Sequence, residues 1–351
     1  MSRKRPGDDL LDGPRGRRVC LSLLTSAHDS LWQLAFHAAR SPADGELTRA
    51  LTRAITEADV ADPGLTDETA LLDALEVSTN AARYWQGPDD LDALLTSPQL
   101  RSALGPVAHQ IGESASVAWW SSPIALDSQR YVQWTDESPL EPPALSGAAD
   151  RLDRWRTNEL SDERRAARRP KAVDASFSGE WWSTPALARL TTTSRSRPDL
   201  GAISLRLTED ALSYGRANVW PLRPAGGCRI YEITEPTAWT KLVARYPMDV
   251  SLSRRHDWWQ ATGHDGSWSI PDWAAVSSDF DAVHLTVTGY LTTAGRALPV
   301  GNSASVLAGW APDQTYWLGD VLESAGDPVE WRLEDRRSKH GRWSRGIPDS
   351  P

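Results

Sequence analysis

Tryptophan is the residue type that most constrains what this chain can fold into. The 351 residues contain 18 Trp but only 3 Phe. Each indole buries a large apolar area and carries an N–H group that needs an acceptor once it leaves water. The fold must therefore enclose many indoles in its core, or it must present them for binding.

Three tryptophan pairs stand out along the chain. Two of them begin nearly the same phrase, Trp-Trp-Ser-Ser-Pro at 119–123 and Trp-Trp-Ser-Thr-Pro at 181–185. The likeness is too short to define a repeat architecture. A duplication and the chance reuse of one local structure, two strand ends with stacked indoles, both stay open. The third pair is Trp258 and Trp259, and we expect it to be exposed because it follows Arg254-Arg255-His256.

Length and charge bound the class of protein. A chain of this size suits two domains. Its net charge of −9 lacks the basic footprint that broad nucleic-acid binding needs. Two cysteines, Cys20 and Cys228, cannot form a disulfide framework and favour a reducing cytoplasm. No stretch approaches the roughly 18–20 apolar residues of a membrane span.

The pattern of apolar residues predicts an α+β fold, with helices first and a mixed helix and strand part after them. Pro106 is expected to break the last helix of the first part. We expect five segments: a disordered basic arm (1–16), a mainly helical domain (17–145), a charged helical linker (146–170), an α+β tryptophan-rich domain (171–335) and a disordered basic tail (336–351).

Several shorter elements follow from local patterns. Mixed charges over 148–169 predict a solvent-facing helix that joins the two domains, although its arginines are also compatible with an acidic partner. Pro236 predicts the start of a helix that runs to Arg245. The expected strands are 117–120, 131–134, 202–207, 228–233 and 282–287.

His284 is the strongest single candidate for chemistry. It lies among Ala282, Val283, Leu285 and Val287, in the segment that reads most clearly as a buried strand. A buried imidazole needs a hydrogen-bond partner. It can act as a general acid or base or orient a ligand, or it can be a structural histidine bonded to backbone or to a nearby hydroxyl. Both interpretations stay open.

Glu232 is the second candidate, because it lies between Tyr231 and Ile233 in an apolar strand. Desolvation raises the pKa of a buried carboxyl group, which suits acid–base work. Arg229 is a possible ion-pair partner if the strand edge bends, and an edge position that faces solvent is the alternative. We therefore assign His284 and Glu232 as candidate catalytic residues.

The segment from His256 to His284 holds the densest group of histidines and aspartates in the sequence. Imidazole and carboxylate together can bind a divalent metal, but the spacing supports this weakly, and we assign no metal ligand. The tryptophans of the same region either line a cleft that stacks a planar ligand or fill a core. The candidate substrate-binding residues are Arg229, Tyr231, Trp258, Trp259 and Trp310.

Residues 229–318 resemble bacterial mono-ADP-ribosyltransferases in a few motifs. Arg229 in Arg-Ile-Tyr, or His284 in His-Leu-Thr, matches the early-strand residue with which that family holds NAD. No Glu-x-Glu or Gln-x-Glu follows, and Glu330 is the late glutamate nearest a strand. The resemblance implies a transferase with NAD as cofactor and Arg229 and Tyr231 near the substrate.

Two functions therefore compete at the level of sequence. One is an intracellular enzyme whose site in the C-terminal domain combines His284 and Glu232 with a wall of indoles. The other is a non-catalytic binding or assembly protein that uses its paired tryptophans as interface anchors. The partner is a small molecule in the first case and a protein in the second.

Overall fold

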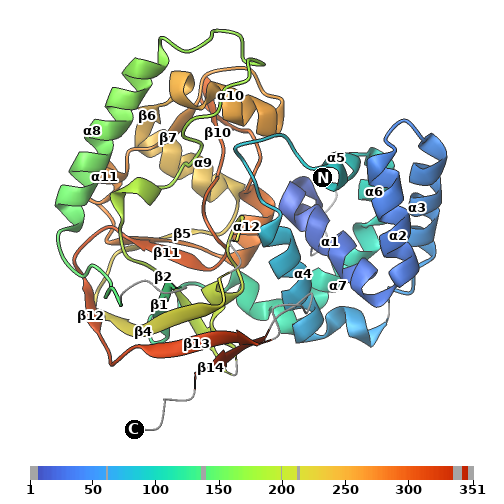
Figure 1. The fold of residues 1–351 in the computed structure, drawn as a ribbon, viewed down its shortest axis with the longest axis horizontal. Coiled ribbons are helices and arrows are strands. Elements are labelled where there is room, and N and C mark those ends of the chain that lie inside the picture. Colours follow the sequence, from blue (N-terminus) through green and yellow to red (C-terminus); the bar gives the residue numbers. More distant parts are fainter. Residues whose placement is uncertain are drawn as a thin grey trace.

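The structure is a computed structural model and describes residues 7–60, 62–135, 140–198, 200–211, 214–334 and 342–346 (Figure 1). The α-helices are α1 (Pro14–Ala27), α2 (Asp29–Arg40), α3 (Gly45–Glu57), α4 (Glu68–Asn80), α5 (Asp90–Leu94), α6 (Pro98–Ala103), α7 (Gly105–Glu113), α8 (Ala148–Ala166), α9 (Pro236–Arg245), α10 (Ser251–Thr262), α11 (Trp273–Val276) and α12 (Val287–Thr293). Short 3-10 helices are η1 (Asp8–Asp12), η2 (Pro63–Thr66), η3 (Ala115–Ser121), η4 (Ala186–Ala188) and η5 (Ile203–Leu205).

The strands are β1 (Gln129–Trp134), β2 (Thr192–Arg197), β3 (Gly201–Ala202), β4 (Arg216–Pro224), β5 (Ile230–Ile233), β6 (Pro247–Asp249), β7 (Ser269–Pro271), β8 (Ala282–Leu285), β9 (Leu298–Val300), β10 (Ser303–Ser305), β11 (Gln314–Trp317), β12 (Leu322–Ser324), β13 (Val329–Glu334) and β14 (Arg342–Arg345). Helices dominate the N-terminal half and strands the C-terminal half, which confirms the predicted α+β class.

One large sheet organises the C-terminal half. Its strand order is β14-β13-β4-β1-β2-β11-β8-β5, with β12 beside β4 and β3 beside β2. Neighbouring strands along this order are antiparallel except β5 and β8, which run parallel. Strand β1, which the sequence predicted at 131–134 within the mainly helical domain, lies in the middle of this sheet between β4 and β2.

The prediction that residues 1–16 form a disordered arm is wrong for the residues of this stretch that the structure describes. Residues 8–12 form η1 and α1 begins at Pro14, with Leu10, Leu11 and Arg15 buried. The Arg15 guanidinium bonds to the Ser78 carbonyl at 2.7 Å and pairs with Asp92. Arg15 thus turns inward, because Asp92 of α5 balances its charge and the Ser78 carbonyl of α4 accepts a further hydrogen bond. The remainder of the arm, residues 1–6, lies outside the described residues.

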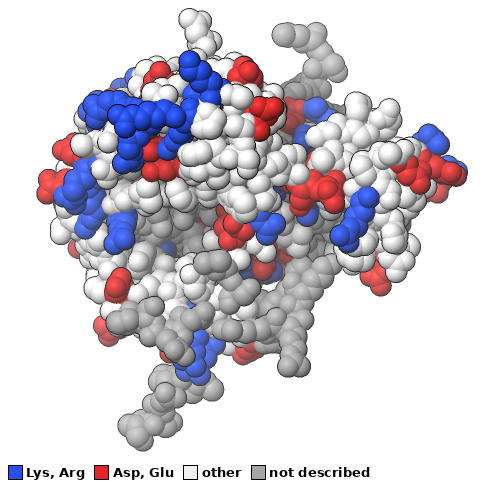
Figure 2. All heavy atoms as spheres, turned by 45° about the horizontal axis from the view of Figure 1, so that its top comes forward, with Lys and Arg blue, Asp and Glu red and all other residues white. Residues whose placement is uncertain are grey.

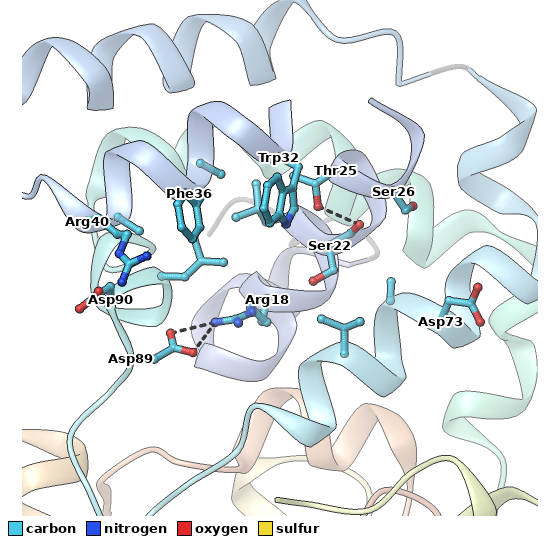
Figure 3. A pocket seen from close by; sticks show the side chains of 16 residues that line it. Arg18, Ser22, Thr25, Ser26, Trp32, Phe36, Arg40, Asp73, Asp89 and Asp90 are labelled. Atoms are coloured by element: carbon cyan, nitrogen blue, oxygen red, sulfur yellow. Dashed lines mark hydrogen bonds and ion pairs between the residues drawn. The ribbon is translucent and has the colours of Figure 1, made fainter. Parts of the chain in front are cut away.

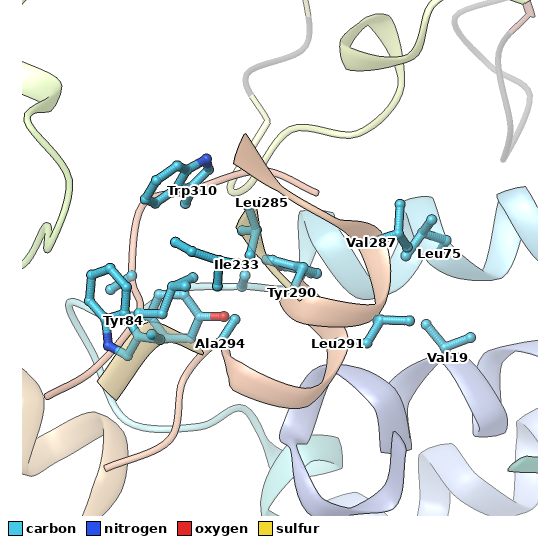
Figure 4. Packing of buried hydrophobic residues seen from close by; sticks show 14 of the residues in the cluster. Val19, Leu75, Tyr84, Ile233, Leu285, Val287, Tyr290, Leu291, Ala294 and Trp310 are labelled. Atoms are coloured by element: carbon cyan, nitrogen blue, oxygen red, sulfur yellow. The ribbon is translucent and has the colours of Figure 1, made fainter. Parts of the chain in front are cut away.

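The two halves share one hydrophobic core. The same cluster of buried side chains runs from Leu10 in η1 to Leu318 after β11. Helix α12 is the joint, and Figure 4 shows Leu291 beside Val19 of α1 and Tyr290 facing Ile233 of β5. Gly289 permits this contact, since a Cβ there would lie 2.2 Å from the Ile233 carbonyl oxygen. Gly289 lies inside α12.

Helix α8 is not a solvent-facing linker, which corrects the sequence interpretation. Trp155, Glu159 and Asp162 on one side of it are buried. The Glu163 carboxylate accepts the backbone N–H groups of Leu252 and Ser253 at 2.7 and 2.8 Å. It thereby supplies from another helix the N-terminal cap that α10 lacks. Only the opposite side of α8 faces water.

A buried ion pair ties α8 to α10 as well. The Arg254 guanidinium donates to Glu159 at 2.8 Å and to the Trp182 carbonyl at 3.2 Å. Burial is the largest influence on Glu159 and raises its pKa to about 7, against the lowering effect of Arg254. Helix α8 thus belongs to the packed body of the C-terminal half.

The expected basic tail is also partly ordered. Residues 342–345 form β14 against β13, and Trp343 packs into a small second core with Trp331 and Val219. Residues 336–341 and 347–351 lie outside the described residues. None of the helices in the described part combines the length and the apolar character that crossing a bilayer requires.

Candidate functional site

The two predicted catalytic residues lie side by side. Strands β5 and β8 pair in parallel with Glu232 opposite His284. The His284 Nδ1 atom lies 2.6 Å from Glu232 Oε2. His284 is fully buried, while about a quarter of the Glu232 side chain is exposed. The partner of the buried imidazole is therefore a carboxylate, and neither the backbone nor a neighbouring hydroxyl fills this role.

Asp313 and Arg195 extend this pair into a chain of charges. His284 Nε2 lies 3.4 Å from Asp313 Oδ1, and the same oxygen accepts Arg195 Nε–H at 2.6 Å. The other Asp313 oxygen accepts the Arg195 backbone N–H at 3.0 Å. Asp313 has a positive φ of 59°, a conformation that costs energy in a residue other than glycine. Its carboxylate is thus directed inward at the start of β11.

The electrostatics of this chain of charges favour the protonated form of the His284 ring. Burial by itself lowers the pKa of His284, but the hydrogen bonds with Asp313 and Glu232 outweigh burial and raise that pKa above its ordinary value. Both ring nitrogens face carboxylates, and carboxylates only accept hydrogen bonds. The imidazolium, which donates from both nitrogens, satisfies all of these contacts at once.

One end of the chain reaches the edge of the protein. Glu232 Oε1 accepts the Ile124 backbone N–H at 2.9 Å. The ring of Trp119 lies between the guanidinium groups of Arg195 and Arg197, whose Cζ atoms are 5.5 and 4.8 Å from its centroid. Segment 119–124 therefore covers the charged chain, and Glu232 is its one partly exposed member.

Chemically, this arrangement can hold a proton between Glu232 and His284 and relay it to water through the exposed part of Glu232. It cannot use His284 as a free base, because both nitrogens are occupied. Asp313 and Arg195 were missed by sequence reasoning. The signal available was weak, because Asp313 lies in the turn Ala-Pro-Asp-Gln and Arg195 in a run of Ser and Thr.

The predicted substrate-binding residues of β5 do not join this chain. Arg229 bonds to Asp281 at 2.8 Å and to the Ser278 carbonyl at 3.0 Å, and about half of its side chain is exposed. Tyr231 donates to the Ala238 carbonyl at 2.7 Å and meets Phe280 edge-on. Alternate residues of a strand face opposite sides, so Arg229 and Tyr231 face away from Glu232.

The predicted indole-lined cleft is wrong for Trp258 and Trp310, because both rings are fully buried. Trp258 Nε1 donates to the Trp181 carbonyl at 2.8 Å, and Trp310 Nε1 donates to the Gln314 carbonyl at 3.0 Å. Trp259 is half-buried. The expectation that the pair Trp258–Trp259 is exposed fails for Trp258, because residues 181–183, which lie against α10, cover its ring.

These covering residues belong to the second copy of the repeated phrase, 181–185. Its backbone carbonyls accept the indole N–H of Trp258, the guanidinium of Arg254 and, at Ser183, the indole N–H of Trp273 at 2.9 Å. The first copy instead forms η3. Trp181 and Trp182 stack at 4.8 Å, whereas Trp119 and Trp120 meet at right angles at 6.4 Å. The two copies therefore do not share one local structure, and neither is a strand end.

The His and Asp residues between 256 and 284 have separate structural roles. His256 contacts the Pro170 carbonyl at 3.1 Å, Asp257 accepts from Ser178 and Gly179, and Asp272 caps α11. His284 lies in the charged chain described above. Within the described ranges, no three His, Cys, Asp or Glu side chains come together in a way that could hold a metal ion.

A pocket of about 400 Å³ lies in the N-terminal half, where the sequence predicted no site. Figure 3 shows Trp32 and Phe36 of α2 on one side of it and the Arg18–Asp89 ion pair on the other. The two rings stack at 5.3 Å, and the Arg40 guanidinium lies 4.9 Å from the centre of Phe36. Leu21, Ala35, Ala39, Ala74, Val77 and Leu91 contribute the apolar lining.

The aromatic pair is unusual because it stays in contact with water. Trp32 is 47% exposed and Phe36 is 40% exposed. Helical spacing of four residues placed both on one face of α2, but the same spacing also describes a core stripe. The sequence therefore indicated that Trp32 and Phe36 share one face of a helix, but it did not indicate that this face is exposed to water. A second pocket of about 340 Å³ lies between α1 and the segment after α12.

Neither of these two pockets includes His284 or Glu232. No family model, curated protein or solved structure matches the chain. The function of the protein must therefore be argued from its own residues.

Proposed function

We propose that the protein binds a small molecule with an apolar or aromatic body in the pocket between α1, α2, α4 and α5. The observation that carries this proposal is the stacked, half-exposed pair Trp32 and Phe36 beside an apolar hollow of about 400 Å³. Small-molecule sites are typically concave, mainly apolar and of a few hundred Å³, with a few polar groups. This pocket has all of these features.

The size of the apolar surface favours a small molecule over a protein partner. A stable protein interface needs about 800 Å² from each partner. Among the described residues, the other large hydrophobic side chains that are exposed lie outside this pocket: Leu126, Leu140, Leu160, Leu187 and Val329. Two aromatic rings alone are too little for such an interface, but they suffice to hold one planar ligand.

The polar groups at the rim suggest how the ligand is oriented. Arg18 is held by Asp89 at 2.9 and 3.0 Å, so its position is fixed before binding. Arg40 lies over Phe36 and is free to move toward a ligand. Ser22 and Ser26 of α1 add hydroxyl groups to the same lining. A ligand that stacks on Trp32 can therefore also form hydrogen bonds at one edge.

The test uses 8-anilino-1-naphthalenesulfonate, an aromatic probe that becomes fluorescent in apolar sites. We expect saturable binding to the wild-type protein. Trp32→Ala and Phe36→Ala should each weaken it about fivefold to tenfold, because each removes one stacking surface. Leu126→Ala is the matched control, since Leu126 is similarly exposed but lies outside the pocket.

Circular dichroism of each variant shows whether its fold is retained, because the probe also binds partly unfolded protein. Equal affinity for Trp32→Ala and the wild type would contradict the proposal. Native mass spectrometry of freshly purified protein then identifies any bound small molecule by its mass.

A second candidate function is acid–base catalysis at Glu232. The observation that favours it is the chain Glu232–His284–Asp313–Arg195, in which hydrogen bonds with Asp313 and Glu232 raise the pKa of the buried His284, because ionisable groups with a perturbed pKa and specific charge partners concentrate at catalytic sites. In this proposal Glu232 is the catalytic residue and His284 positions it. A transferase that uses NAD is the form suggested by the resemblance of residues 229–318.

The test for this second function is release of nicotinamide from NAD by the purified protein. Glu232→Gln should abolish release while circular dichroism stays unchanged. Glu235→Gln is the control, since Glu235 is exposed three residues away. Absence of release from the wild type, or equal release from Glu232→Gln, would reject NAD chemistry at this carboxylate.

A further inference from the structure

The outer side of α8 carries several exposed arginines together with the exposed carboxylates Asp150 and Asp153. Arg154, Arg164 and Arg168 are exposed along the helix, and Arg189 after η4 is exposed close to it. In Figure 2, Lys and Arg side chains gather on the left of the molecule, where α8 runs. The inner side of α8 uses its carboxylates for buried contacts, as described above.

A pocket of about 210 Å³ opens on this outer side, between α8 and η4. Its polar lining consists of three guanidinium groups and one amide, from Arg151, Arg154, Arg189 and Asn158. Trp155, Leu187 and Ala188 complete it, and no Asp or Glu contributes to its lining. The ionisable groups of the lining are therefore all positive, although the whole chain has a net charge of −9 and Asp150 and Asp153 are exposed on the same helix.

The donors of this pocket lack acceptors. Within the described part of the chain, no carboxylate forms an ion pair with Arg151, Arg154 or Arg189, whereas Arg156 and Arg165 of the same helix pair with Asp272 and Asp162. Trp155 is 2% exposed, and its indole Nε1–H finds no acceptor among the described residues. A buried N–H without a partner is costly.

The backbone at Arg189 adds an independent sign of a specific arrangement. Its φ is +52°, in the left-handed region that a residue with a large side chain rarely occupies. Such strain persists only where the surroundings fix it, and it is frequent at ligand sites. Here it places the third arginine at the mouth of the pocket.

We propose that this pocket binds a doubly charged oxyanion, with phosphate as the chemical group that fits best. Three guanidinium groups favour a dianion over a single carboxylate, and arginine forks match the oxygens of a phosphate. The Asn158 amide can donate to oxygens that enter the pocket, whereas the Trp155 Nε1–H is buried beneath the lining and reaches an oxygen only if the lining shifts. Leu187 at the rim leaves room for an apolar neighbour of the phosphate in a phosphate monoester.

The experiment measures binding of inorganic phosphate and of phenyl phosphate by isothermal titration calorimetry at constant ionic strength. We expect Arg154→Gln and Arg189→Gln to weaken phosphate binding about tenfold or more each, since each removes a charge-assisted contact. Trp155→Phe removes the indole donor and keeps the ring, so it should weaken binding less. Arg164→Gln is the matched control, because Arg164 is an exposed arginine of α8 outside the pocket lining.

The outcomes separate the possible sources of the group. Tighter binding of phenyl phosphate than of phosphate supports a phosphate monoester, and equal binding supports free phosphate. Undetectable binding of both anions to the wild type would overturn the proposal. Equal weakening by Arg164→Gln and Arg154→Gln would also overturn it, because the effect would then reflect general charge.

Discussion

Two groups of aromatic residues, one in each half of the molecule, lie in opposite environments. In the C-terminal half, Trp239, Trp273 and Trp310 pack against one another, and each indole N–H bonds to an oxygen of the same half. In the N-terminal half, Trp32 and Phe36 stack on each other, Arg40 lies over Phe36, and both rings stay partly in water. A ring whose surface and N–H are both satisfied internally serves stability. A ring pair left open beside a hollow is available to a ligand.

The first prediction concerns the closed group of rings and has the largest expected effect. Trp310→Ala should lower the free energy of unfolding by about 3–5 kcal/mol, because it leaves a large cavity among rings that cannot collapse onto it. Urea denaturation followed by circular dichroism measures the change. A loss below about 1 kcal/mol would show that the cluster is loosely packed.

The second prediction concerns the buried ion pair between Arg254 of α10 and Glu159 of α8. Arg254→Met should cost about 3 kcal/mol, because it leaves Glu159 buried without its partner. The double variant Arg254→Met with Glu159→Leu should regain most of this stability, since a buried ion pair is often replaceable by apolar side chains. If the double variant were no more stable than the single one, the backbone contacts of Arg254 and not its charge would dominate.

The third prediction is a pH dependence. Because the folded pKa of His284 lies above its ordinary value of 6.5, the charged ring stabilises the fold fully below about pH 6.5, and this stabilisation is lost as the pH rises through the folded pKa. The stability difference between wild type and His284→Gln should therefore shrink with rising pH. Urea denaturation from pH 5.5 to 9 measures it, and a constant difference would contradict an imidazolium.

The smallest effect is expected for the open pair. Trp32→Ala should change the free energy of unfolding by no more than about 0.5 kcal/mol, because half of the ring is already in water. The same denaturation experiment as for Trp310→Ala provides the comparison. A large loss for Trp32→Ala would mean that the ring belongs to the core of the helical half, and the contrast between the halves would then disappear.

Local chemistry in the sequence foretold several elements. Helix α9 begins at Pro236 and ends at Arg245 as expected, and the chain breaks between α6 and α7 just before Pro106. The strands around Glu232 and His284 are also present. In contrast, residues 117–120 and 203–205 form 3-10 helices instead of strands. Their apolar residues meet long-range partners, which a local pattern of alternation does not reveal.

The candidate sites were less accessible from sequence. The pairing of Glu232 with His284 depends on which strands become neighbours, and Asp313 and Arg195 join only through the order of β2, β11 and β8. Trp258 was misjudged because residues 181–183, which cover it, lie more than 70 positions away. The openness of Trp32 and Phe36 depends on where α4 and α5 leave space, a property of packing that no single helix pattern contains.

Helix α12 also determines when the packing of the N-terminal half can be completed during synthesis. The earliest helix, α1, packs against α4 and α2 and also against α12 (residues 287–293), so the part of its apolar side that α12 covers stays exposed until most of the polypeptide has left the ribosome. A Cβ at Gly13 would lie 2.5 Å from the Leu291 carbonyl oxygen, which shows how closely these two distant segments meet. The nascent N-terminal half must therefore wait, with an uncovered face, for a late segment to arrive, and it depends during that interval on shielding by chaperones or by its own transient contacts.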